Sequence, residues 1–293
     1  MIASGSVRRL ARFCLVTANA ERLADFYEKA FGCHRIATEP LGGPASGPLM
    51  NRDDGARCLC LALGDEIVEL WEFAKPGDPY PAHSLASDLI FQHFAILVTN
   101  MAQALQRLSK AQGWVAITRG GPQHLPAQSG GVTAFKFRDP EGHPLEFLQY
   151  PALKVPQKWQ RARANRICLG IDHSAISIGD MAVSIDFYEA LGLRRSGQSL
   201  NVGREQECLD ALPDVKVEVT TMLPPDSGPH LELLCYQRVL RERPEIRDRQ
   251  AIAATRLVFE LQLATDSAES SDLLDPDAHH LTVVRCPEIR RLE

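Results

Sequence analysis

The stretch that decides the fold is Arg12-Phe-Cys-Leu-Val-Thr-Ala-Asn19, a short apolar segment that ends in an asparagine. The pattern returns as His93-Phe-Ala-Ile-Leu-Val-Thr-Asn100 and His173-Ser-Ala-Ile-Ser-Ile-Gly-Asp180, and a weaker copy begins at Arg256. In the three clear copies the final Asn or Asp can accept hydrogen bonds from the free amides of a following helix. The copies begin at residues 12, 93, 173 and 256, so successive starts lie 81, 80 and 83 residues apart. We therefore predict four related modules.

Each predicted helix leads into short apolar segments that are separated by turns. The clearest turn is Asp139-Pro-Glu-Gly142, because proline suits its second position and glycine can adopt positive φ. Its counterpart, Asp275-Pro-Asp-Ala278, begins 275 minus 256, or 19, residues after its module starts, against 139 minus 93, or 46, in module two. The last module has lost about 27 residues, which we predict to be its helix and one strand. His143 and His279, beside these turns, are expected at the surface.

The modules predict an α+β fold of two domains, each with paired β-α-β-β-β modules in one curved mixed sheet. A length of 293 residues also favours two domains. We place modules one and two in residues 8–150, and module three and the truncated module four in residues 166–293. The segment 151–165 contains Pro156 and several Lys and Arg without an apolar period, and it is the predicted linker.

The composition favours a small-molecule partner. A net charge of -5 provides no field that would attract nucleic acid or anionic lipid. No apolar run approaches the ~18 residues of a membrane span. The 8 cysteines lack the spacing of a disulfide scaffold, which favours a reducing, cytoplasmic location. Sheet edges left by the shortened fourth module would allow a homodimer.

Ionisable residues recur at matching places in the modules. The first-strand positions hold Arg12, His93, His173 and Arg256. The last-strand positions hold Glu69, Glu146, Glu232 and Thr282. A carboxylate on the inner face of a strand is costly to bury unless it is paired or binds a cation. Imidazole nitrogen together with carboxylate oxygen suits zinc, iron, manganese or nickel, so a divalent metal ion is the predicted cofactor.

These motifs resemble the vicinal oxygen chelate superfamily, which includes glyoxalase I, extradiol ring-cleavage dioxygenases and bleomycin-resistance proteins. The resemblance rests on the segment from His93, on Ala134-Phe-Lys-Phe-Arg-Asp-Pro-Glu-Gly-His-Pro-Leu-Glu146, and on Ile171-Asp-His-Ser-Ala-Ile-Ser-Ile with the helix containing Phe187-Tyr188. It covers nearly the whole chain and implies two glyoxalase-like domains. It also implies that paired modules form a cup whose metal ligands come from their first and last strands.

Carried over to this chain, the resemblance gives the N-terminal cup the metal ligands Glu69, His93 and Glu146. Either glutamate would then act as the catalytic base. Arg12 stands where a histidine or glutamine ligand is often found, and a guanidinium cannot bind a metal. Arg12 would instead bind a substrate carboxylate or pair with one of the glutamates.

The C-terminal cup would have only His173 and Glu232, which makes it a secondary or degenerate site. The Gly-rich loop of residues 120–131 could bring Gln123 or His124 to the substrate, although an ordinary connecting loop is the simpler interpretation.

Three functions follow from this resemblance. The first is a glyoxalase-like, metal-dependent lyase or isomerase that acts on a small oxygenated substrate with an acid group. The second is an extradiol-type dioxygenase, which Arg12 disfavours because it breaks the two-histidine, one-carboxylate triad of non-haem iron oxygenases. The third is a non-catalytic small-molecule binding protein of the bleomycin-resistance type.

Overall fold

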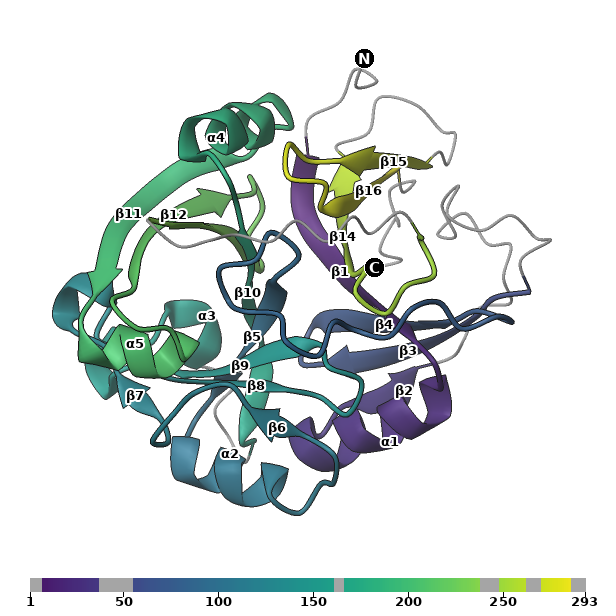
Figure 1. The fold of residues 1–293 in the computed structure, drawn as a ribbon, viewed down its shortest axis with the longest axis horizontal. Helices are drawn as coiled ribbons and strands as arrows, with labels where there is room; N and C mark the ends of the chain where they lie inside the picture. The colour runs from purple at the N-terminus through teal and green to yellow at the C-terminus, as the bar shows by residue number, and fades with distance from the viewer. Residues whose placement is uncertain (1–6, 37–54, 161–165, 238–247, 262–269, 286–293) are drawn as a thin grey trace, which may run out of the picture.

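The computed structural model describes residues 7–36, 55–160, 166–237, 248–261 and 270–285. It contains two mixed β-sheets that lie side by side, with helices α1 and α2 along the same side of the molecule (Figure 1). No helix in these ranges is both long and apolar enough to cross a membrane.

The seven-stranded sheet is built from modules one and four. Its strand order is β15-β16-β14-β1-β4-β3-β2. The strands are β1 (Val7–Thr17), β2 (His34–Ile36), β3 (Arg57–Leu63), β4 (Glu66–Glu72), β14 (Arg256–Leu261), β15 (Ser270–Leu274) and β16 (His280–Arg285). Module one adds helix α1 (Ala20–Phe31). The described residues of module four, 256–261 and 270–285, form three strands and no helix, as expected of a shortened module.

The nine-stranded sheet is built from modules two and three. Its order is β11-β12-β13-β10-β5-β9-β8-β6, and β7 pairs with β8. The strands are β5 (Gln92–Val98), β6 (Val115–Ala116), β7 (Gln123–His124), β8 (Thr133–Arg138), β9 (Pro144–Gln149), β10 (Cys168–Ser177), β11 (Arg194–Val202), β12 (Lys216–Leu223) and β13 (His230–Tyr236). The helices are α2 (Met101–Leu108), α3 (Gln157–Gln160), α4 (Met181–Ala190) and α5 (Arg204–Asp210), with 3-10 turns η2 (Ala127–Ser129) and η3 (Ala152–Lys154).

The α+β fold of paired modules is confirmed, but our expectation of which modules share a sheet is wrong. β1 runs antiparallel to β14, and β5 runs antiparallel to β10. Module one is therefore joined to module four, and module two to module three. The first strands of all four modules have the same apolar pattern, so that pattern cannot specify which strand each will take as its neighbour. Each sheet consequently draws strands from both halves of the chain.

The predicted helix starts are confirmed by capping hydrogen bonds. Asn19 accepts a bond from the Arg22 amide at 2.9 Å, and Asn100 accepts one from the Gln103 amide at 3.0 Å. Asp180 caps α4 in the same way, through the amides of Ala182 and Val183. The repeated Asn or Asp thus marks the change from strand to helix in three modules.

The Asp-Pro turns are buried junctions, which corrects our expectation for their histidines. His143 is 1% exposed and its Nε2 lies 2.9 Å from the carbonyl oxygen of Val16 at the end of β1. His279 is 5% exposed and makes the equivalent contact, at 2.9 Å, with the carbonyl of Ser177. Each turn therefore joins the last strand of one module to the first strand of the module before it, across the two sheets.

One hydrophobic core unites both sheets with α1, α2 and α4. At its centre, Phe13 of β1 and Phe94 of β5 have ring centroids 5.4 Å apart. The part of the predicted linker that is described also packs against the structure, since Trp159 of α3 is buried and donates to Asp172 Oδ1 on β10 at 3.2 Å. The sheets are consequently held together along most of their length.

Candidate metal site and cavity

Strand register in the nine-stranded sheet brings four of the predicted residues onto one patch. His93 on β5 lies opposite Ala175 on β10, and His173 on β10 lies opposite Ala95 on β5. The outer neighbours supply the carboxylates: Glu146 on β9 is in register with Ala95, and Glu232 on β13 is in register with Ala175. Two histidines and two glutamates therefore surround a pair of small alanines.

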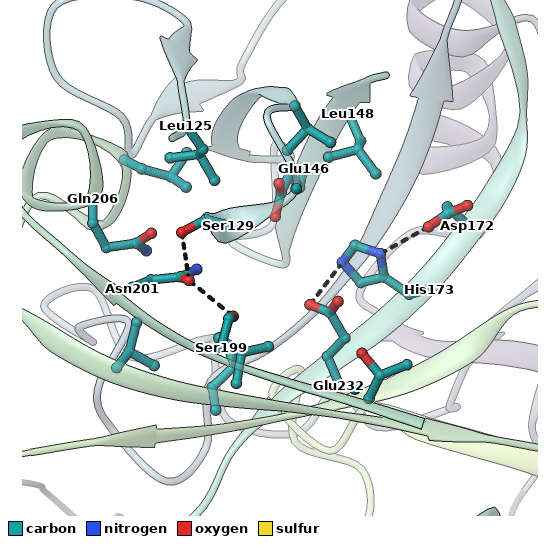
Figure 2. A pocket seen from close by; sticks show the side chains of 18 of the residues that line it. Leu125, Ser129, Glu146, Leu148, Asp172, His173, Ser199, Asn201, Gln206 and Glu232 are labelled. Atoms are coloured by element: carbon teal, nitrogen blue, oxygen red, sulfur yellow. Dashed lines mark hydrogen bonds and ion pairs between the residues drawn. The ribbon is translucent and has the colours of Figure 1, made fainter. Parts of the chain in front are cut away.

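The ligand atoms of this patch lie close enough to share one cation. Atoms of His93, Glu146 and His173 all lie within 4.8 Å of one another. His93 Nε2 is 2.9 Å from Glu146 Oε2, and His173 Nε2 is 3.5 Å from Glu232 Oε2. Figure 2 shows Glu146, His173 and Glu232 facing the same space. Of the predicted ligands Glu69, His93 and Glu146, the last two are thus joined by His173, and Glu232 lies beside His173.

Asp172 fixes the orientation of His173. Its Oδ2 lies 3.2 Å from His173 Nδ1 and accepts a hydrogen bond from the Tyr150 hydroxyl at 3.1 Å. This leaves His173 Nε2 directed toward Glu232, the arrangement in which a carboxylate orients a metal-binding imidazole. Neighbours on a regular strand point to opposite faces, but the register of β10 shifts between Ile171 and His173. Sequence reasoning missed Asp172 because the pattern gives no sign of this irregularity.

The surroundings of His93 suit a metal ligand. Its side chain is buried, and neither ring nitrogen makes a hydrogen bond of acceptable geometry. Burial lowers the pKa of His93, and Lys136 and His173 act in the same direction, which outweighs the opposing effect of Glu146. The neutral imidazole that results is the form that binds metals. This buried, neutral ring, whose Nε2 faces the Glu146 carboxylate at 2.9 Å, fits a metal ligand.

Both glutamates are held as carboxylates. Burial opposes ionisation of Glu146, but His93 and Lys136 lower its pKa overall. Burial also opposes ionisation of Glu232, but His173 and His230 lower its pKa to about 2. The pKa of His173 is raised. Burial alone would lower it, but Glu232 and Asp172 have the larger combined effect and raise it to about 9. A cation bound here would therefore compete with the proton on His173.

The quartet lines a cavity of about 300 Å³ that is formed by modules two and three. Across the cavity lie Ser129, Ser199, Asn201 and Gln206 (Figure 2). Ser129 Oγ and Ser199 Oγ donate to Asn201 Oδ1 at 2.7 and 2.9 Å, which links turn η2 to strand β11 at the cavity wall. The cavity thus has a wall of neutral hydrogen-bonding groups opposite the ionisable quartet.

Lys136 in the cavity lining belongs to a buried ion pair. Lys136 Nζ lies 2.6 Å from Asp210 Oδ1, and both side chains are at most 4% exposed. Burial opposes the charge on Lys136, but Asp210 and Glu146 raise its pKa overall. Repeat comparison does not identify Lys136, because the equivalent positions of the other modules carry no lysine.

The structure does not bring Glu69 or Arg12 to this site. Arg12 Nη1 donates to Glu69 Oε1 at 2.8 Å in the seven-stranded sheet. Glu69 Oε2 accepts bonds from Cys14 Sγ and Trp71 Nε1, both at 3.0 Å. Our grouping of Glu69 with His93 and Glu146 was wrong because β4 pairs with β1, whereas His93 and Glu146 belong to the other sheet.

The matching patch of the seven-stranded sheet has a different chemistry. By register, Cys14 lies opposite Arg256, and Thr282 is in line with Val258. Arg12 and Arg256 consequently take the places that His173 and His93 occupy in the other sheet. Guanidinium groups do not ligate metals. The arginine that stands at position 12 in place of a metal ligand therefore belongs to this second patch. It does not affect the four residues of the nine-stranded sheet.

Gln123 and His124 do not line the cavity. Gln123 Nε2 donates to the carbonyls of Arg119 and Gly121, and His124 Nδ1 lies 3.3 Å from Thr133 Oγ1. Two other residues of the same loop, Gln128 and Ser129, do line the cavity. Strand β7 pairs with β8, and this pairing holds Gln123 and His124 away from it.

Fold and site together define a class of α+β protein in which two modules curve around a cavity with an inward-facing His and Glu quartet. Residues 9–147 match the Glyoxalase/Bleomycin resistance protein/Dioxygenase superfamily. Residues 9–147 are therefore similar to the domains of this superfamily.

Solved structures agree over almost the entire chain. Glyoxalase I from Zea mays superposes with a TM-score of 0.58 at 16% identity, covering 95% of this chain and 92% of that one. A "putative dioxygenase" from Bacillus subtilis gives 0.57 at 13% identity, covering 96% and 86%. At these identities the likeness establishes the fold alone. No curated protein matches the chain in sequence.

Proposed function

We propose that this protein is a metal-dependent lyase or isomerase of the glyoxalase type, with its site in the nine-stranded sheet. The observation that supports this most directly is the group of His93, Glu146 and His173, whose ligand atoms lie within 4.8 Å of one another on the wall of a cavity that Glu232 also lines. Imidazole nitrogens, which bind metals in their neutral form, together with carboxylate oxygens suit zinc, nickel, manganese or iron.

A divalent cation held by these residues would polarise neighbouring oxygens of a small substrate and favour loss of a proton from the adjacent carbon. We assign the proton transfer to Glu232. Its side chain is 24% exposed, compared with 7% for Glu146, so it is the more accessible of the two carboxylates. Asp172 would keep His173 oriented, and Lys136 would favour the charged form of Glu146.

We expected an acid group on the substrate because Arg12 could bind a carboxylate. Arg12 does not lie at this site, so there is no longer a reason to expect an acid group. Arg12 is occupied by Glu69 in the other sheet. The proposal is consequently limited to a small molecule with two neighbouring oxygens.

The test begins with metal-stripped protein. Zinc, nickel, manganese and ferrous iron are titrated by calorimetry, and the loaded protein is then incubated with dihydroxyacetone in D₂O. We expect metal binding at one site per chain and deuterium incorporation beside the carbonyl, both reduced in Glu232→Gln. Metal binding with no exchange across a panel of hydroxyketones would instead favour the non-catalytic binding protein. A protein that binds none of the four metals would exclude the proposal.

One observation favours a second candidate, an extradiol-type dioxygenase. His93, His173 and Glu146 form a two-histidine, one-carboxylate group, the donor set typical of non-haem iron oxygenases. Arg12 no longer argues against this triad, since it lies in the other sheet. Oxygen uptake with catechols under ferrous iron tests this candidate, and no uptake across a catechol panel would remove it.

A further inference from the structure

Asp210, which lies behind the cavity lining, is bonded to three lining residues. It accepts bonds from Lys136 Nζ at 2.6 Å, Gln206 Nε2 at 2.7 Å and the Tyr236 hydroxyl at 3.0 Å. The carboxylate is 2% exposed. An ionised carboxylate only accepts, so Gln206 must turn its NH₂ group toward Asp210. The amide orientation of Gln206 is therefore fixed by its neighbour.

The other end of the same amide is left without a partner. Gln206 is 4% exposed, lines the cavity, and its Oε1 makes no hydrogen bond. Figure 2 shows it on the wall across from His173 and Glu232. A buried carbonyl oxygen without a donor is unfavourable, and native structures leave few such atoms unsatisfied. A ligand that supplies a hydroxyl or amide N–H would satisfy it.

Charge in the cavity opposes an anionic ligand. Glu146, Asp172 and Glu232 supply negative charge among the described lining residues, and none of those residues is an arginine. Lys136 is the lysine in the lining, and its charge is compensated by Asp210. A carboxylate placed near Gln206 would meet a carbonyl oxygen, because the cationic groups Lys136 and His173 lie beside Asp210 and Glu232.

We infer that the cavity selects a neutral ligand that donates a hydrogen bond to Gln206 Oε1 while its two neighbouring oxygens face the quartet. Gln206 is then a specificity-determining residue, and the substrate class is a hydroxylated or amide-bearing carbonyl compound rather than an acid. The inference rests on the proposed function for the position of the two oxygens. The need for a hydrogen-bond donor on the ligand rests separately on the hydrogen bonds of Asp210, which fix the orientation of the Gln206 amide.

Matched chelating probes test the inference directly. A hydroxamate offers two neighbouring oxygens, and its tail can end in a primary amide or in a carboxylate of nearly the same shape, with one to three methylenes between. Each probe is titrated by calorimetry into zinc-loaded protein. We expect the amide probe to bind at least about tenfold more tightly than its carboxylate partner at the best chain length, since one hydrogen bond and one charge distinguish them.

Gln206→Met should lower the affinity of the amide probe by about tenfold and leave the carboxylate probe unchanged. This variant also removes a donor from Asp210, so Tyr236→Phe is the control: it removes another donor from the same oxygen and keeps Gln206. Tyr236→Phe should retain the preference for the amide. Should Gln206→Met fail to fold, the two probes with the unaltered protein still decide the sign of the preference.

Carboxylate probes that bind as tightly as amide probes at every length would overturn the inference. So would a preference that survives Gln206→Met or is lost equally in Tyr236→Phe. These outcomes are separate from failure of the proposed function, because zinc binding is measured first and without any probe. Absence of zinc binding would refute the proposed function and remove the position assigned to the ligand.

Discussion

The imidazole rings of His93 and His173 lie 6.0 Å apart, although they belong to modules two and three, on opposite sides of the predicted linker. Their strands are antiparallel neighbours. The candidate metal site therefore exists only where the two halves of the chain meet. This relationship determines which substitutions should affect the site and which should not.

Metal affinity should depend on Glu146 and not on Glu69. Loss of a residue that merely orients a ligand commonly lowers metal affinity 10- to 100-fold, so loss of a ligand should cost at least as much. We expect Glu146→Gln to weaken zinc binding by about 100-fold or more in calorimetric titration. Glu69→Gln removes the same charge from the other sheet, where Glu69 pairs with Arg12, and is the matched control. Equal losses in the two variants would contradict the assignment.

The residue types of the site could be predicted from the sequence, but their grouping could not. Repeat positions marked His93, Glu146, His173 and Glu232 as candidates, and the structure places all four in the lining of one cavity. The spacing is the same whether a module pairs with the next one or with a distant one, so it carries no information about which strands become neighbours. Pairing depends on the whole core, in which Phe13 and Phe94 of different modules pack together. Glu69 was therefore assigned to the wrong sheet.

Comparing the four modules with one another could not identify site residues that do not recur between modules. Asp172 depends on a local irregularity of β10, and Gln206 lies on α5, which has no α-helical counterpart at that place among the described residues of the other modules. Lys136 depends on contact with Asp210 across two modules. Such contacts follow from tertiary packing and leave no periodic trace.

Replacing Lys136 should destabilise the fold strongly. Removal of one partner from a buried ion pair leaves the other charge buried without compensation, which typically costs about 3–5 kcal/mol of stability. Lys136→Met would leave Asp210 buried with only neutral donors, so we expect a loss of this size in urea unfolding. The double variant Lys136→Met/Asp210→Asn removes both charges and should recover part of the loss. A single variant as stable as the unaltered protein would show that Asp210 is neutral in the fold.

Glu66 should make stability fall as pH rises through neutrality. It extends from β4 to β10, where its Oε2 accepts the Ile171 amide at 3.1 Å. Burial raises the pKa of Glu66 from 4.5 to about 7, despite the opposing effect of that hydrogen bond. A pKa that is higher in the folded state contributes stability below the unfolded value, and this is lost as pH rises through the folded value. At about 1.4 kcal/mol per pKa unit, the loss amounts to about 3 kcal/mol at most.

The variant Glu66→Gln tests this dependence, because it keeps an acceptor for Ile171 and cannot ionise. Its free energy of unfolding, minus that of the unaltered protein, should rise by up to about 3 kcal/mol between pH 5 and pH 8. The exposed neighbour Asp65 provides the comparison: it contributes to the raised pKa of Glu66 but less than burial does, so Asp65→Asn should keep most of the pH dependence. A constant difference for Glu66→Gln would mean that Glu66 is charged throughout this range.

Separately expressed halves of the chain should assemble with each other. Cutting after Gln160 leaves the first half with β1 and β5 and the second with their partners β14 and β10. Each half alone would expose the edges of two strands and the apolar surface around them, which favours reassociation. We expect the halves to co-purify through a tag on either one, and the pair to bind zinc. His173→Gln in the second half should then abolish zinc binding, although His93 and Glu146 lie in the first. Two halves that purify separately as folded monomers would support independent domains at 8–150 and 166–293 and would contradict the sheet pairing.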